Sequence, residues 1–251
     1  MEERWIDLSL GKLPYLTGGQ GKKMLFLHGG VATPHAYIPL FEKLSSLYEI
    51  YAPTHPGHGK SIHISNNWTI EDYINIYKEF LDKINIDPQV MIGHSFGGAL
   101  ALLLAPDYPQ SKVIVFDGAG LPLNLQVNEY FAFMVNEAKT LIAKRTELPF
   151  VTDILSKIES LADTVTRHPE DLPWMAKNVL SMDISKKLTG ITNQVSLYWG
   201  EDDLIVKPEI GRNMSKILRN STFEIISGKG HTYPAIDIDL TYNLIVKADS
   251  K

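Results

Sequence analysis

The sequence contains no cysteine, which excludes a disulfide framework, a thiolate nucleophile, a cysteine-ligated zinc and an iron–sulfur centre. It also lacks a surplus of positive charge, because 24 Lys and Arg stand against 29 Asp and Glu and leave a formal net charge of -5. No block of Lys and Arg is longer than two residues. Nucleic acid is therefore not expected as a partner.

Long apolar stretches are missing as well. The nearest approach is the run from Ala99 to Ala105, which is much shorter than the roughly 18 residues that a membrane-spanning helix requires. The first residues, MEERWIDLSLGK, are charged and lack the apolar core of a secretory signal. We therefore expect a soluble, cytoplasmic protein with no membrane partner.

What is present is an ordinary globular composition, with 44% hydrophobic and 21% charged residues. A length of 251 residues predicts one large domain with room for an insertion. Neither an internal repeat nor a low-complexity segment interrupts it.

Short apolar strands alternate with amphipathic helices over most of the chain. Two edge strands are expected near the N-terminus, at 5–8 and 13–16, and a helix is expected over 70–84, capped by Thr69 and Asp72. Continuous apolar runs predict strands that are buried on both faces. Such buried strands are expected at 24–27 and 90–92, and further strands are expected at 48–52, 113–116, 195–199 and 222–226. This order predicts an α/β fold with a mostly parallel sheet and helices on both faces.

Between 119 and 189 the sequence shows helical periodicity and no convincing strand. We expect this segment to form a helical cap, inserted into a core made of residues 1–118 and 190–251. Ligands bind at the carboxyl edge of such sheets, and the insertion must lie over that edge. Its aromatic and methionine side chains favour an apolar substrate. The cap residues expected to line the pocket are Phe131, Met134 and Trp174.

The most informative motif is the G-x-S-x-G sequence over 93–97, which stands between a buried strand and a helix of small residues. A serine at its centre occupies a tight turn, and the flanking glycines remove side chains that would collide there. The turn holds the hydroxyl over the carboxyl edge of the sheet, and the following helix directs N–H groups toward developing negative charge. Ser95 is therefore the predicted nucleophile.

A serine nucleophile needs a base and a carboxylate that orients the base. The strand at 195–199 runs into a loop that contains Asp202 and Asp203, and the following strand leads to His231. The order nucleophile, acid, base is the one expected for this architecture. His231 is the predicted base, and an acid in the 200–203 loop is the predicted orienting group.

Several of these motifs resemble those of the α/β-hydrolases, in particular the capped single-domain serine hydrolases. The resemblance covers nearly the whole chain and rests on His28-Gly29-Gly30, the HPGHGKS sequence over 55–61, the Ser95 turn, Gly200-x-x-Asp203 and Gly230-His231. It implies that Asp203 is the acid, with Asp117 and Asp202 as alternatives. It also implies an oxyanion hole formed by the backbone N–H groups of Gly30 and Phe96.

These residues predict a carboxylesterase-like serine hydrolase that cleaves a small, largely apolar ester or similar acyl compound through an acyl-enzyme. The same residues leave open a carbon–carbon bond hydrolase of the β-diketone type, a thioesterase and an aminopeptidase. A cofactor-free oxygenase or perhydrolase and a ligand-binding receptor are further alternatives. Epoxide opening and halide removal are disfavoured, because capped relatives use an aspartate at the turn for those reactions. No cofactor is expected, and the protein is expected to be a monomer or a homodimer.

We expect the other histidines near the motifs to have structural roles. His28 and His94 flank the predicted site, where we expect them to border the pocket and to pack or hydrogen-bond rather than react. The loop that contains His55, His58 and His63 has no nearby carboxylate in a metal-ligand spacing. No metal site is therefore expected.

Overall fold

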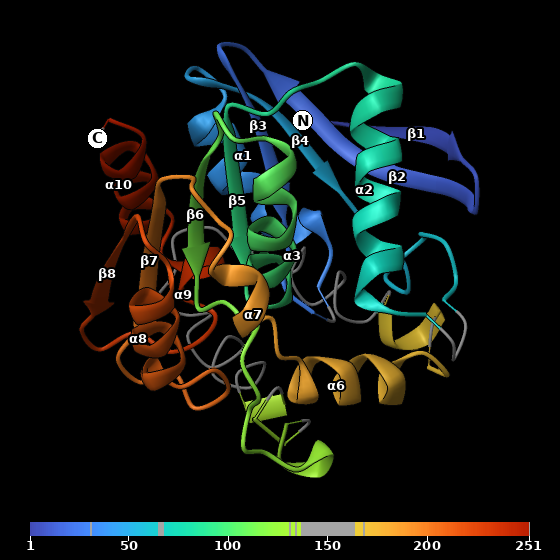
Figure 1. Ribbon diagram of the computed structural model, residues 1–251. Coiled ribbons are helices and arrows are strands. Elements are labelled where there is room, and N and C mark those ends of the chain that lie inside the picture. The colour runs from blue at the N-terminus through green and yellow to red at the C-terminus, as the bar shows by residue number, and fades with distance from the viewer. Residues whose placement is uncertain are drawn as a thin grey trace, which may run out of the picture.

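The computed structural model describes residues 1–30, 32–64, 68–130, 132–133, 135–136, 164–167 and 169–250. Its strands are β1 (Glu2–Leu8), β2 (Gly11–Gly19), β3 (Lys22–Leu27), β4 (Tyr48–Pro53), β5 (Val90–His94), β6 (Lys112–Phe116), β7 (Val195–Gly200) and β8 (Ser221–Ile226). They form one sheet in the order β1-β2-β4-β3-β5-β6-β7-β8 (Figure 1). β2 is antiparallel to both of its neighbours, and the strands from β4 to β8 in this spatial order are parallel. The predicted fold class is confirmed.

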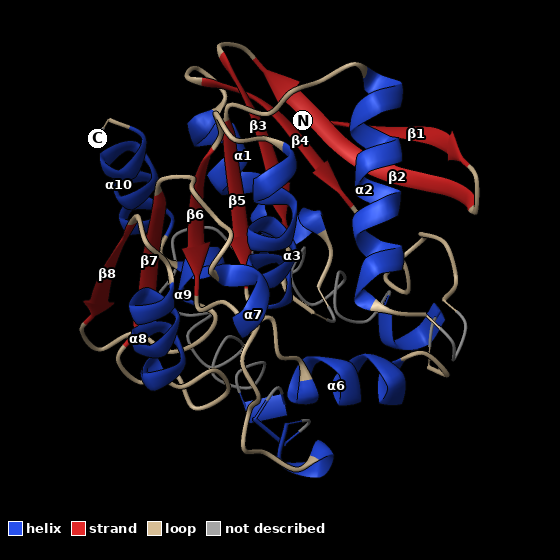
Figure 2. Ribbon diagram, in the orientation of Figure 1, coloured by secondary structure: helices blue, strands red, loops and turns tan. Residues whose placement is uncertain are grey.

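Helices cover both faces of the sheet (Figure 2). The helices are η1 (Pro34–Tyr37), α1 (Ile38–Leu44), α2 (Ile70–Ile84), α3 (Phe96–Leu104), η2 (Ala105–Asp107), α6 (Leu172–Ser181), α7 (Ser185–Leu188), α8 (Pro208–Ile217), α9 (Tyr233–Ile236) and α10 (Ile238–Asp249). One apolar cluster joins α1 and α10 to one face, and a second cluster joins α2, α3, α6, α7 and α8 to the other.

The two-sided burial explains why the central strands are continuous apolar runs. In β3, Met24 and Phe26 belong to the cluster with α1 and α10, whereas Leu25 and Leu27 belong to the opposite cluster. All four side chains are buried. Successive strand residues point to opposite faces, so a strand covered on both sides has no position for an exposed polar residue.

The helix predicted over 70–84 is present with the predicted cap. The Thr69 backbone N–H donates to Oδ2 of Asp72 at 2.6 Å, which satisfies one of the N–H groups left free at a helix start. The helix ends at Asn85, whose left-handed φ of 55° stops the helical path. Tyr73 lies on the buried face of this helix, close to the carboxyl edge of the sheet. There its ring stacks on that of Trp174 in α6, with the ring centroids 6.3 Å apart.

Between β6 and β7 the described residues contain helices and no strand. Figure 1 shows α6 beyond the end of the sheet toward which the arrowheads of β6 and β8 point, which is the carboxyl edge. The cap expected over 119–189 stays a prediction, because residues 137–163, Phe131 and Met134 lie outside the described residues. None of the described helices has both the length and the apolar character needed to cross a membrane.

Candidate active site

Ser95 is the single residue between β5 and α3. Its backbone has φ 53° and ψ -119°, a conformation that residues with a side chain rarely adopt. Close packing explains the glycines on either side. A Cβ on Gly93 would lie 2.2 Å from the carbonyl oxygen of Gly97, and one on Gly97 would lie 2.1 Å from that of Leu27. The turn therefore holds Ser95 rigidly at the carboxyl edge of the sheet.

The structure brings Ser95, His231 and Asp203 together. Nε2 of His231 lies 3.0 Å from Oγ of Ser95, and Nδ1 of His231 lies 2.7 Å from Oδ2 of Asp203. The residues are only 6%, 4% and 2% exposed, respectively. A carboxylate can only accept, so Nδ1 carries the ring proton and Nε2 is left to accept from the serine hydroxyl. This is the arrangement that a serine nucleophile needs.

The loop after β7 fixes the carboxylate of Asp203. Its Oδ1 accepts the backbone N–H groups of Ile205 at 2.8 Å and Val206 at 2.9 Å. These two donors fix the carboxylate so that Oδ2 faces His231. The acid in contact with the base is thus held by its own loop.

The two alternative acids are placed differently. Asp117 is buried, and its Oδ1 accepts the Gly200 N–H at 2.7 Å. It lies close to the base all the same, because ligand atoms of Asp117, Asp203 and His231 all fall within 4.8 Å of one another. Asp202 is exposed. Among the three, Asp203 has the short contact to His231.

His94 and Tyr37 support the backbone of His231. Nε2 of His94 lies 2.9 Å from the carbonyl oxygen of His231, and Nδ1 lies 2.7 Å from the Tyr37 hydroxyl. Burial lowers the pKa of His94 to about 3, so its ring is neutral and carries one proton. That proton is on Nε2, because a carbonyl only accepts, and Tyr37 therefore donates to Nδ1. Sequence reasoning missed Tyr37, which belongs to no motif.

His28 connects two loops beneath the site. Its Nδ1 donates to the Gly29 carbonyl at 2.8 Å, and its Nε2 accepts the His55 N–H at 2.9 Å. The rings of His28 and His55 stack with their centroids 3.7 Å apart. The loop that leads to Gly30 is therefore fixed against the loop after β4. His28 and His94 both hydrogen-bond within the protein.

A narrow pocket lies beside the Ser95 turn. Gly30 and Phe96, whose N–H groups are the predicted oxyanion donors, both border it. Trp174 lines it, whereas His28 and His94 are not among its described lining residues. The other lining residues, which sequence reasoning did not single out as pocket residues, are His58, Tyr130, Leu172, Met175, Ala176, Asn178 and Val179.

The chain is similar to several known proteins. Residues 22–151 match the model of the alpha/beta hydrolase fold family. The 2-hydroxy-6-oxo-6-phenylhexa-2,4-dienoate hydrolase of Comamonas testosteroni is 25% identical over 256 aligned residues, which cover 90% of this chain and 86% of that protein. Haloalkane dehalogenase 2 of Mycobacterium tuberculosis is 28% identical over 105 residues, which cover 41% of this chain and 37% of that protein.

A solved structure has a similar fold to that of this chain. The enol-lactonase from Burkholderia xenovorans LB400 superimposes with a TM-score of 0.83 at 16% identity, over 99% of this chain and all of that one. At this identity the similarity concerns the fold alone. The family match spans more than half of the 251 residues. The chain belongs to the alpha/beta hydrolase fold family.

Proposed function

We propose that this hydrolase cleaves small, largely apolar carboxylic esters with Ser95 as its nucleophile. The observation that carries the proposal is the buried line of hydrogen bonds from Ser95 through His231 to Asp203. The pocket beside it is lined mainly by apolar side chains, including Phe96 and Trp174. An apolar pocket next to an activated hydroxyl suits a neutral acyl group.

The proposed reaction has two halves, formation and hydrolysis of an acyl-enzyme, and the same side chains act in both. Oγ of Ser95 attacks the ester carbonyl while Nε2 of His231 takes its proton, and Asp203 stabilises the imidazolium that forms. The backbone N–H groups of Gly30 and Phe96 hold the oxyanion. Collapse of the intermediate expels the alcohol, which receives the proton from His231. Water then repeats the sequence on the acyl-enzyme, releases the carboxylic acid and restores Ser95.

Halide removal is a weaker interpretation. The dehalogenase relative aligns with only 41% of this chain. Capped relatives that remove halide use an aspartate at the turn, whereas the turn here carries the hydroxyl of Ser95. The hydroxyl is suited to acyl transfer instead.

Carbon–carbon bond hydrolysis is the second candidate. It is favoured by the Comamonas relative, whose similarity extends over 90% of this chain. A ketone next to an activated methylene offers Ser95 a carbonyl, and the carbon leaving group takes the proton that an alcohol takes in ester cleavage. Both candidates therefore use the same three side chains.

A substrate panel distinguishes the two candidates. We expect saturable turnover of p-nitrophenyl esters with short acyl chains, falling when the acyl chain outgrows the pocket. A 2-hydroxy-6-oxo-dienoate, monitored by loss of its absorbance, should react more slowly. Preference for the dienoate would favour the second candidate. If neither the esters nor the dienoate were turned over, both candidate functions would be contradicted.

Tyr37→Phe tests the support behind His231. The variant removes the donor to Nδ1 of the buried His94, and an unsatisfied buried acceptor costs about 1–3 kcal/mol. If about 1.4 kcal/mol of this appears in the transition state, kcat for the ester falls about tenfold. We expect KM to change little, because Tyr37 does not line the pocket. The matched control is Tyr48→Phe, which loses a hydroxyl contact to Asp249, and equal kcat values in the two variants would contradict a positioning role.

A further inference from the structure

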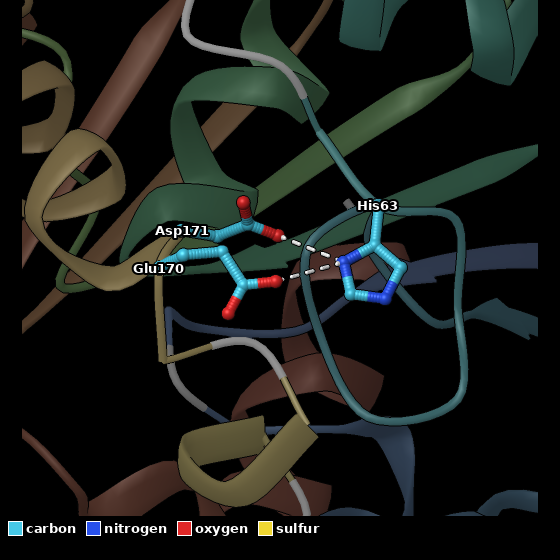
Figure 3. Close-up of side chains that lie close together, drawn as sticks. All are labelled: His63, Glu170 and Asp171. Atoms are coloured by element: carbon cyan, nitrogen blue, oxygen red, sulfur yellow. Dashed lines mark ion pairs between the residues drawn. The ribbon is translucent and has the colours of Figure 1, made fainter.

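A cluster of three metal-ligand side chains lies where α6 meets the loop after β4, apart from the residues of the proposed reaction. His63 comes from the loop, and Glu170 and Asp171 immediately precede α6; Figure 3 shows the two carboxylates directed toward the imidazole. Nδ1 of His63 lies 3.4 Å from Oε1 of Glu170 and 3.7 Å from Oδ2 of Asp171. One ligand atom from each residue falls within 4.8 Å of the other two.

These separations are those of ion pairs, and they also suit a shared ion. They exceed the 2.7–3.2 Å of an N–H···O hydrogen bond. Four ligands at about 2.1 Å from a tetrahedral zinc ion lie about 3.4 Å from one another. We propose that His63, Glu170 and Asp171 bind a divalent transition-metal ion of the zinc type, with a fourth position left for water. The imidazole ligand disfavours Mg²⁺ and Ca²⁺, which prefer oxygen ligands.

Burial and charge at the cluster agree with this proposal. The side chain of Asp171 is 5% exposed, whereas His63 and Glu170 are 63% and 61% exposed, so an ion can enter from solvent and reach a buried carboxylate. Two carboxylates this close repel each other, and a divalent cation between them removes that repulsion.

The position of the site connects it to the pocket. Leu172 and Trp174 of α6 line the pocket from one side, and His58 lines it from the loop after β4. An ion held by His63 and Asp171 would therefore tie together two segments that border the pocket. The inference does not depend on ester hydrolysis, because binding is measured without substrate.

The test is calorimetric titration of the chelator-treated 251-residue chain with ZnCl₂. We expect one saturable equivalent of zinc and no comparable binding of MgCl₂. Losing a residue that merely orients a ligand already costs about 10–100-fold in metal affinity. His63→Ala and Asp171→Asn, which remove ligands, should therefore weaken binding at least about tenfold. Glu170→Gln, at an exposed position, should weaken it even if the buried Asp171 variant folds poorly.

Two controls exclude other histidine sites. His35→Ala removes a half-buried imidazole whose Nε2 lies 3.4 Å from Oε1 of Glu3, and zinc affinity should stay unchanged. His231→Ala removes the histidine of the buried group that includes Asp117 and Asp203, and should also leave the affinity unchanged.

Three outcomes would overturn the proposal. These are the absence of saturable zinc binding, wild-type affinity in His63→Ala, and an equal loss of affinity in His35→Ala or His231→Ala. Melting temperatures measured in chelator show whether each variant is folded before its titration is interpreted. Increased protection of residues 172–181 from hydrogen exchange on adding zinc would further support the tie to α6.

Discussion

Ser95→Ala is expected to lower kcat for a p-nitrophenyl ester by about 10³-fold or more, because it removes the atom that attacks the ester carbonyl and forms the acyl-enzyme. Alanine keeps the Cβ, so the strained backbone of the turn is unchanged and the loss belongs to the hydroxyl. The remaining rate should reflect the backbone donors of Gly30 and Phe96. The measurement is steady-state turnover of enzyme freed of wild-type contamination.

Ser196→Ala is the matched control for this substitution. Ser196 is also a buried serine, 3% exposed, but it lies within β7 and away from His231. Its replacement should leave kcat within about twofold of the wild type, because a hydroxyl remote from the site gives no transition-state stabilisation. An unchanged rate in Ser95→Ala would remove the assignment of the nucleophile.

Asp203→Asn is expected to lower kcat by about 10³–10⁴-fold, because an amide can donate to Nδ1 of His231 and so place the ring proton on Nε2. In that tautomer the imidazole cannot accept the proton of Ser95. The asparagine side chain keeps an oxygen for the N–H groups of Ile205 and Val206, so the loop should stay in place. Turnover and melting temperature, measured together, separate the two effects.

Asp117→Asn distinguishes the two buried acids. An asparagine oxygen can still accept the Gly200 N–H that Asp117 accepts, so we expect less than about a tenfold loss of kcat. A larger loss in Asp117→Asn than in Asp203→Asn would identify Asp117 as the acid behind His231. The proximity of both carboxylates to the imidazole makes this comparison necessary.

The central sheet was predictable because its signals are local. A strand buried on both faces requires apolar residues at successive positions, as in Met24 to Leu27, and the α2 cap requires only Thr69 and Asp72. The turn at Ser95 was equally local, because Gly93 and Gly97 are required by contacts within a few ångströms. Such features depend little on the rest of the chain.

The acid could not be chosen from the residues alone. Asp117 and Asp203 each follow a central parallel strand, and both strands end at the same edge of the sheet. Chain order therefore brings both carboxylates close to His231. The difference lies in side-chain direction, which is set by the N–H groups of Ile205, Val206 and Gly200. The catalytic roles themselves stay predictions until the variants are measured.

Contacts between distant segments were beyond sequence reasoning. The expectation that His63 has no nearby carboxylate considered only spacing along the chain, and it was wrong in space, because folding brings Glu170 and Asp171 to it. Tyr37 reaches His94 across 57 residues. No periodicity or motif marks such pairs, because they depend on how α6 and η1 pack on the sheet.

Covalent labelling tests the proposed activation of Ser95 most directly. Intact-mass spectrometry after treatment with a fluorophosphonate should show one adduct, mapped to Ser95 by peptide analysis. His231→Ala should show no adduct over the same time, because the hydroxyl then has no base at 3.0 Å. Labelling of His231→Ala at the wild-type rate, or an adduct on another residue, would contradict the proposed pairing of Ser95 with His231.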